Sequence, residues 1–226
     1  MTRPPTRTVA RPTKRYHYID DGPAIYVDSF ATIRREADLS TIPADAEKLA
    51  VRMIHGTGQT DLIADLAIHP DLVRAARSAL DAGAPILCDA RMVATGITAS
   101  RLPADNAVHC FLHDERVPAL ARDWQTTRTA AAVSLWEPLL DGAVVAIGNA
   151  PTALFHLLEM LIDGAPRPAA IIGCPVGFIG AAESKDALAT FSRDHGIDIP
   201  YVTIRGRRGG SALTSSAVNA LASETE

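Results

Sequence analysis

His55 is the residue of this sequence with the clearest potential for proton transfer. It ends a helix predicted over residues 45–55, and Gly56-Thr57-Gly58 follows it. The negative end of a helix dipole favours the imidazolium by roughly 0.3–2 kcal/mol, which predicts a pKa raised toward neutrality, where a proton donor works well. Arg52 shares the helix face of His55. Its charge would lower that pKa, and it could also hold an anionic ligand. The alternative role for His55 is to cap the helix end.

Four loops that follow predicted strands are rich in glycine, proline and short polar residues. In open α/β sheets, ligands bind beyond the carboxyl ends of the strands. A helix that starts there points free backbone N–H groups and its positive dipole end into the crevice. The loops therefore predict an anion-binding site, and the alternative is that they only make tight turns. The loops are residues 89–91, 148–152, 173–177 and 205–211, the last of which adds three arginines.

The sequence lacks the short motifs of the common nucleotide and hydrolase sites. It contains no GxxxxGKS or GxxxxGKT, no GxSxG, no HExxH, and no GxGxxG in a first strand-to-helix turn. ATP use, hydride transfer and serine hydrolysis are therefore unsupported. Cys88, Cys110 and Cys174 are dispersed, and no two histidines have metal-ligand spacing. We therefore expect no metal site, and we interpret the cysteines as buried small apolar residues in a reducing cytoplasm.

The segment 151–162 predicts a helix that is apolar nearly all round. Such a helix is buried. Burial inside the fold and burial in a subunit interface both explain it, and the sequence leaves the choice open. His156 and Glu159 stand out on this helix, and we expect them to form a satisfied core pair.

Short apolar runs alternate with helical patterns from residue 84 onward. This alternation predicts an α/β fold with a parallel sheet covered on both faces, that is, a three-layer α/β/α arrangement. The first third of the chain is more helical, and no linker follows residue 20, so we expect a single domain with a helical N-terminal portion. The predicted strands are 85–89, 107–112, 144–148, 169–173 and 201–204, and the helices are 29–38, 45–55, 70–82, 118–140, 151–162, 181–195, one from Ala90 and one from about Ser211.

The composition excludes several classes of protein. The chain has 226 residues and a formal net charge of −4, without the basic excess of a protein that grips nucleic acid. No apolar run is long enough to cross a membrane. Residues 1–15 are basic and lack the apolar stretch of a secretory signal. We expect them to be a disordered leader, or alternatively a basic docking arm, ahead of one domain over residues 16–226 in the cytoplasm.

Several longer blocks of sequence resemble the precorrin-8X methylmutase family of cobalamin biosynthesis. The resemblance runs from about Tyr18 to Leu221 in one register. The blocks that carry it are Met53-Ile54-His55-Gly56, Ala84 to Asp89, Ala146 to Leu154 (AIGNAPTAL) and Pro175 to Lys185 (PVGFIGAAESK).

The resemblance implies an isomerase that moves a methyl group from carbon 11 to carbon 12 of a tetrapyrrole macrocycle and gives hydrogenobyrinic acid, with no metal, nucleotide or redox cofactor. It implies that His55 protonates the macrocycle and that Ser29, Arg52, Arg128 and Thr98 bind the substrate. It further implies a Rossmann-like fold and a homodimer with the active site near the subunit interface. Two alternatives stay open: the same chemistry on the cobalt-containing intermediate of the anaerobic route, and a non-catalytic corrinoid carrier.

Overall fold

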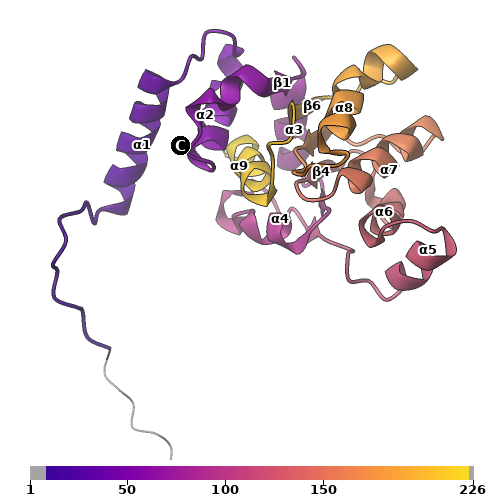
Figure 1. Cartoon of the computed structure of the whole chain (residues 1–226), viewed down its shortest axis with the longest axis horizontal. Helices are drawn as coiled ribbons and strands as arrows, with labels where there is room; N and C mark the ends of the chain where they lie inside the picture. The colour runs from indigo at the N-terminus through magenta and orange to yellow at the C-terminus, as the bar shows by residue number, and fades with distance from the viewer. Residues whose placement is uncertain (1–8, 224–226) are drawn as a thin grey trace, which may run out of the picture.

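The structure, a computed structural model, describes residues 9–223 and is built around one six-stranded sheet (Figure 1). The strands lie in the order β1-β6-β5-β4-β2-β3. All neighbours from β6 to β3 pair parallel. The bounds are β1 Leu66–Ile68, β2 Ile86–Cys88, β3 Val108–His109, β4 Val144–Ile147, β5 Ala170–Gly173 and β6 Tyr201–Ile204. The expectation of one α/β domain is confirmed.

Strand β1 corrects the expectation of a wholly parallel sheet. It pairs antiparallel with β6, with Leu66 opposite Ile204. Sequence analysis missed β1 because three residues carry almost no periodicity, and because its partner strand lies near the other end of the chain. The other edge strand, β3, is shorter than the predicted segment 107–112. The chain turns away after it, and the backbone N–H of Asp114 donates to the carbonyl of Phe111 at 2.9 Å.

The predicted helices 151–162 and 181–195 agree closely with the structure, whereas the predicted helix 118–140 is divided into α5, α6 and η4. The α-helices are α1 Gly22–Glu36, α2 Glu47–His55, α3 Leu72–Asp81, α4 Arg91–Gly96, α5 Val117–Asp123, α6 Arg128–Ser134, α7 Pro151–Ile162, α8 Ala181–His195 and α9 Ser211–Leu221, and the short 3-10 helices are η1 Ala44–Ala46, η2 Thr60–Asp65, η3 Ala99–Arg101 and η4 Glu137–Leu139.

Helix α1 begins at Gly22 rather than at Ser29. Asp21 caps it, since its carboxylate accepts a hydrogen bond from the Ala24 N–H at 3.1 Å. Pro23 in the first turn has the fixed φ that suits a helix start. The earlier start adds two turns to the helix, and these include a residue of the candidate site.

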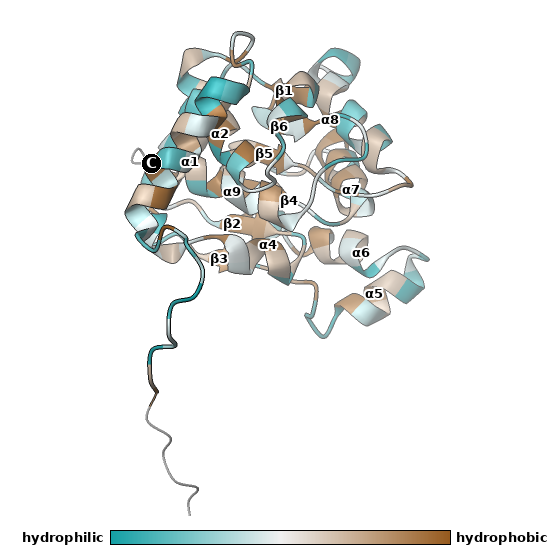
Figure 2. Ribbon diagram, turned by 60° about the vertical axis from the view of Figure 1, so that its left-hand side comes forward, coloured by the Kyte–Doolittle hydropathy of each residue, from teal (hydrophilic) through white to brown (hydrophobic). Residues whose placement is uncertain are grey.

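The strands send alternate side chains to two hydrophobic clusters on opposite faces of the sheet. Ile86 and Val144 pack on one face with residues of α2, α3, α4 and α9. Leu87 and Val145 pack on the other with residues of α6, α7 and α8. Figure 1 shows these two groups of helices on either side of the strands. Figure 2 shows apolar residues concentrated in the sheet, with polar residues on the outer faces of the helices.

One face of helix α7 is buried inside the fold, whereas Ile162 at its end is exposed. Its side chains pack against the sheet and against α6 and α8. The residues that are buried are Ala153, Leu154, Leu157, Leu158 and Leu161. These five side chains are therefore buried within one chain, without a subunit interface.

Helix α9 packs very closely against three other elements. A Cβ on Gly96, at the end of α4, would lie 2.7 Å from the Cβ of Ser215. A Cβ on Gly148, after β4, would lie 2.9 Å from the Cβ of Thr214. A Cβ on Gly56, directly after α2, would lie 2.3 Å from a serine hydroxyl of the same helix. Only glycine at positions 96 and 148 allows this approach, whereas the hydroxyl that faces Gly56 can rotate away. Through these contacts α9 sets the positions of α2, α4 and the end of β4.

The loop between β4 and α7 is tied to the end of β2 by Asp89. The buried carboxylate accepts hydrogen bonds from the backbone N–H groups of Gly148, Asn149 and Ala150 at 2.9, 2.8 and 2.8 Å. Burial raises the pKa of this carboxyl group, while the three hydrogen bonds lower it. These three N–H groups belong to a loop that was predicted to bind an anionic ligand. Asp89 already occupies them, so the predicted anion site is wrong for this loop.

The predicted basic leader, residues 1–15, lies partly outside the described residues. Residues 9–15 are exposed and belong to no helix or strand. Arg11 and Lys14 contact the carboxylate of Asp20 at 3.3 and 3.1 Å. The disorder of the leader stays a prediction.

We expect Asp89→Ala to lower the free energy of unfolding by at least about 3 kcal/mol, because each buried N–H group left without a partner costs about 1–3 kcal/mol. Urea denaturation followed by circular dichroism measures the change. Asp141→Ala, which removes an exposed carboxylate before β4, is the control and should stay within about 0.5 kcal/mol of wild type. Equal stabilities of the Asp89 variant and wild type would contradict a structural role for this carboxylate.

Candidate active site

His55 is the last residue of α2, and its side chain is exposed at the end of a buried helix. The preceding residues from Leu49 to Ile54 are all buried, which anchors the helix. Gly56 follows and packs against α9. The predicted helix end is confirmed, and the imidazole extends from a rigid element.

Helix α1 holds the imidazole through one face of its second and third turns. The hydroxyl of Ser29 lies 2.9 Å from Nδ1 of His55. The ring centroids of Tyr26 and Phe30 lie 5.3 and 5.1 Å from that of the imidazole. These three residues have i, i+3, i+4 spacing and therefore point the same way. Since Ser29 engages Nδ1, proton exchange with a ligand would use Nε2.

Tyr26 and Phe30 are site residues that sequence reasoning missed. The signal was their helical spacing around Ser29, but the helix was predicted to begin at Ser29, so Tyr26 was placed outside it. Phe30 is buried, and its ring lies 5.2 Å from the guanidinium carbon of Arg52.

The structure reverses the expected direction of the His55 pKa. Burial, and secondarily the charge of Arg52, lower this pKa from its ordinary value. Sequence analysis expected the helix dipole to raise it. The dipole effect is small in a short helix and is screened at an exposed end, whereas desolvation always disfavours the charged imidazolium. Arg52 itself is only 7% exposed.

An open cavity of about 390 Å³ adjoins the imidazole. Helix α1 supplies one wall, and the segment from Ile54 to Thr60 supplies the other. Ser29 and His55 both line it, and Arg52 does not. The structure therefore brings Ser29, Arg52 and His55 together, with Arg52 behind the cavity wall.

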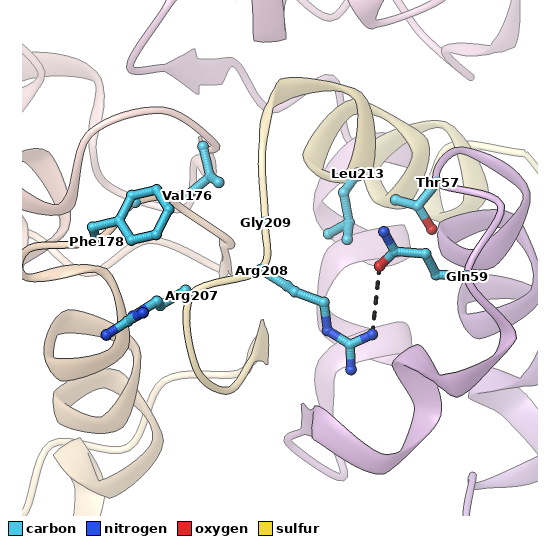
Figure 3. A pocket seen from close by; sticks show the side chains of 9 residues that line it. Thr57, Gln59, Val176, Phe178, Arg207, Arg208, Gly209 and Leu213 are labelled. Carbon is cyan, nitrogen blue, oxygen red and sulfur yellow. Dashed lines mark hydrogen bonds between the residues drawn. The ribbon is translucent and has the colours of Figure 1, made fainter.

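Two more cavities lie along the carboxyl edge of the sheet, where the sequence predicted ligand-binding loops. One, of about 300 Å³, is shown in Figure 3 and is lined by Phe178, Arg207 and Arg208 among others. A larger one, of about 710 Å³, is lined by Arg91 and the first turn of α9. Both include Thr57, which is close to His55 in sequence.

Neither Arg128 nor Thr98 lines the cavity of His55. Arg128 begins α6, on the opposite face of the sheet from α2, and its guanidinium donates to the carbonyl of Leu112 at 3.3 Å. Thr98 precedes η3, where its backbone N–H donates to the side chain of Asn219 at 2.8 Å.

His156 is satisfied by a partner other than the one expected. Its Nε2 lies 2.7 Å from the hydroxyl of Ser134. Glu159 is 73% exposed, and its carboxylate lies 4.0 Å from Nδ1. The expected pair with Glu159 therefore forms as a long contact, but it does not lie in the core, because the Glu159 side chain faces solvent.

The buried thiols have little nucleophilic potential. Burial raises the pKa of Cys174 to about 12. All three cysteines are free thiols. Across residues 9–223, no three histidine, cysteine or acidic side chains gather closely enough to hold a metal ion. No helix in that range has the length and apolar character to cross a membrane.

The fold and the site together define an α/β enzyme with an oriented histidine beside open cavities and without nucleotide-binding motifs. The chain belongs to the precorrin-8X methylmutase family, whose model matches residues 24–224. The resemblance found in the sequence blocks, and the isomerase class that it implied, are thereby confirmed.

Individual relatives cover almost the whole chain. The precorrin-8X methylmutase of Pseudomonas aeruginosa is 61% identical over 209 residues, which are 92% of this chain and 99% of the relative. The cobalt-precorrin-8 methylmutase of Salmonella typhimurium is 34% identical over 214 residues, covering 91% and 96%. A crystal structure of precorrin-8X methylmutase from Thermus thermophilus superposes with a TM-score of 0.79 at 39% identity, covering 88% of this chain and 94% of that one.

We expect the pKa of His55 to lie below 6.5, so that its imidazole is mostly neutral at pH 7. Arg52→Met should raise this pKa because it removes a nearby positive charge, whereas Arg52→Lys should keep it low. NMR titration of the histidine ring protons measures it, with the His55 signal assigned by its loss in a His55 variant. A wild-type pKa above 6.5 would contradict the assignment.

Proposed function

We propose that this chain catalyses the isomerisation of precorrin-8X to hydrogenobyrinic acid, with His55 as the proton donor. The observation that carries the proposal is the imidazole held by Ser29 at Nδ1 beside an open cavity. The methyl group moves from carbon 11 to carbon 12 within one molecule. Substrate and product are isomers, so the proton lent by His55 must return before the enzyme can turn over again.

The lowered pKa of His55 suits a donor that is charged only when substrate is bound. We assign to the free chain the neutral tautomer with its proton at Nε2, in which Nδ1 accepts a hydrogen bond from Ser29. A macrocycle with many carboxylates brings negative charge close to the ring, which raises the pKa of a histidine. The bound imidazole thus becomes a stronger hydrogen-bond donor toward ring C of the macrocycle.

The cobalt-free substrate is favoured by the comparisons. Two relatives named for precorrin-8X are 61% and 59% identical to this chain, whereas one named for cobalt-precorrin-8 is 34% identical. No residue of the site separates the two substrates on its own. Turnover of each substrate in separate assays is the direct measurement.

We propose that the active unit is a homodimer in which the Arg128 that binds substrate comes from the second copy. Within one chain, α6 and α2 lie on opposite faces of the sheet. Helix α1 also exposes Ile25, Tyr26 and Val27, the last at 67% exposure. A second copy packed there would cover these apolar side chains and would complete the cavity. We propose that Thr98 also binds substrate in this homodimer. We further propose that the enzyme works in the cytoplasm and that its fold is a Rossmann-like three-layer fold.

His55→Ala should lower kcat at least about 100-fold, as expected for loss of a positioned general acid. Ser29→Ala removes only the bond that orients the ring, and we expect a loss of about fivefold. Conversion of precorrin-8X followed by absorbance measures both, with circular dichroism as the check on folding. Turnover by His55→Ala at the wild-type rate would contradict the mechanism. A wild-type chain that binds product but converts neither substrate would identify a corrinoid carrier.

Co-expression of His55→Ala and Arg128→Ala chains tests the shared site. Each variant alone should be inactive or weak, with Arg128→Ala binding product roughly tenfold to hundredfold more weakly. Random pairing of two chains makes half of the dimers mixed, and each mixed dimer contains one intact site, so activity should recover to about a quarter of wild type. If both residues served the same chain, no mixed site would be intact and no recovery would occur.

A further inference from the structure

We propose that Arg207 and Phe178 form a binding subsite for one carboxylate-bearing edge of a flat conjugated ligand. This inference rests on the proposed function, since a tetrapyrrole macrocycle has the required chemistry. The resemblance to the family gave neither residue a role of its own. Both residues line the cavity of Figure 3 and not the cavity of His55.

The two loops that carry these residues are fastened together. The backbone N–H of Gly210 donates to the carbonyl of Cys174 at 2.9 Å, and that of Gly177 donates to the carbonyl of Arg207 at 3.3 Å. A Cβ on Gly209 would lie 2.4 Å from the Cys174 carbonyl oxygen, so only glycine permits this contact. The loops therefore present Arg207 and Phe178 on a fixed frame.

The neighbouring arginine is already neutralised by the chain. The guanidinium of Arg208 contacts the carboxylate of Asp61 at 2.9 Å and also that of Asp65. The buried ammonium of Lys185 donates to the Arg208 carbonyl. Figure 3 shows Arg208 extending toward Gln59, away from Phe178. Arg208 is thus a structural residue, and its pairing fixes the loop that carries Arg207.

The guanidinium of Arg207 is available to bind a ligand. Its guanidinium lies 5.3 Å from the ring centroid of Phe178, within the range of a cation–π contact. Among the ion pairs of residues 9–223, none involves Arg207. A guanidinium that is stacked on a ring keeps its edge N–H groups free to bind a carboxylate by two hydrogen bonds.

Phe178 supplies the apolar half of the subsite. It is 84% exposed beside a cavity of about 300 Å³ whose lining also includes Val176 and Leu213. An exposed ring next to apolar side chains favours a flat hydrophobic partner. Together, one cation and one ring match a conjugated ring system with a carboxylate side chain.

The same loop connects the subsite to the proton donor. The residues after His55 alternate between the two cavities, with Gly58 and Thr60 lining that of His55, and Thr57 and Gln59 lining that of Arg207. A ligand that reaches across this loop would contact both cavities. The subsite therefore adds affinity and orientation at a distance from the reacting carbon atoms.

Absorbance titration of the full chain with hydrogenobyrinic acid tests the subsite. Arg207→Gln should raise Kd roughly tenfold to hundredfold, as for loss of hydrogen bonds to a charged group, and Phe178→Ala should raise it about tenfold. The matched controls are Arg205→Gln, on the same loop but outside this cavity, and Ile179→Ala, which is 91% exposed beside Phe178 and does not line it. Both controls should keep the wild-type Kd.

The fully methyl-esterified product separates the contribution of Arg207 to binding from that of Phe178. Because the ester carries no carboxylate charge, Arg207→Gln should bind it as wild type does, while Phe178→Ala should still bind it more weakly. Equal loss in Arg205→Gln and Arg207→Gln would overturn the subsite in favour of a general charge effect. Loss of dimerisation in Phe178→Ala without a change in Kd would overturn it in favour of a subunit contact.

The two proposals fail in different ways. If the wild-type chain does not bind hydrogenobyrinic acid, the proposed function fails and the subsite falls with it. If the wild type binds but both the Arg207 and Phe178 variants bind equally well, only the subsite is overturned.

Discussion

The close packing of α9 is the constraint on which the arrangement of the site depends. Gly96 and Gly148 allow the helix to approach α4 and the end of β4 more closely than any side chain would permit, and Gly56 packs against the same helix directly after His55. The end of α2 is thereby fixed relative to the sheet. The first turn of α9 also lines the cavities at the carboxyl edge. One helix thus fixes the positions of both His55 and the residues that line these cavities.

Local pairing of charged groups, and not the overall net charge of −4, determines which charges a ligand can meet. Asp89 uses the N–H groups after β4, and Asp61 and Asp65 neutralise Arg208. These contacts hold loops in place and remove groups that a ligand could otherwise use. Arg207, by contrast, faces an open cavity. A mildly acidic chain can therefore bind an anionic macrocycle through a few local groups.

The accuracy of the sequence predictions followed the strength of the local signal. The bounds of β6, α7 and α8 were predicted to the residue, because apolar runs bounded by glycine, proline or a helix cap leave few alternatives. Strand β1 was missed because its antiparallel pairing with β6 is a long-range contact. The start of α1 was misplaced although Asp21 and Pro23 carried a start signal, and Tyr26 was lost from the site as a result.

The sequence by itself determined the α/β class, most of the strands, the family and the position of His55 at a helix end, because each depends on neighbouring residues or on long matched blocks. Only the tertiary structure decided that Ser29, Tyr26 and Phe30 surround the imidazole and that burial and Arg52 lower its pKa. It also decided that, among the described residues, Arg208 has carboxylate partners while Arg207 has none. Desolvation, ring contacts and ion pairs depend on which distant segments meet, and no local pattern in the chain carries that information.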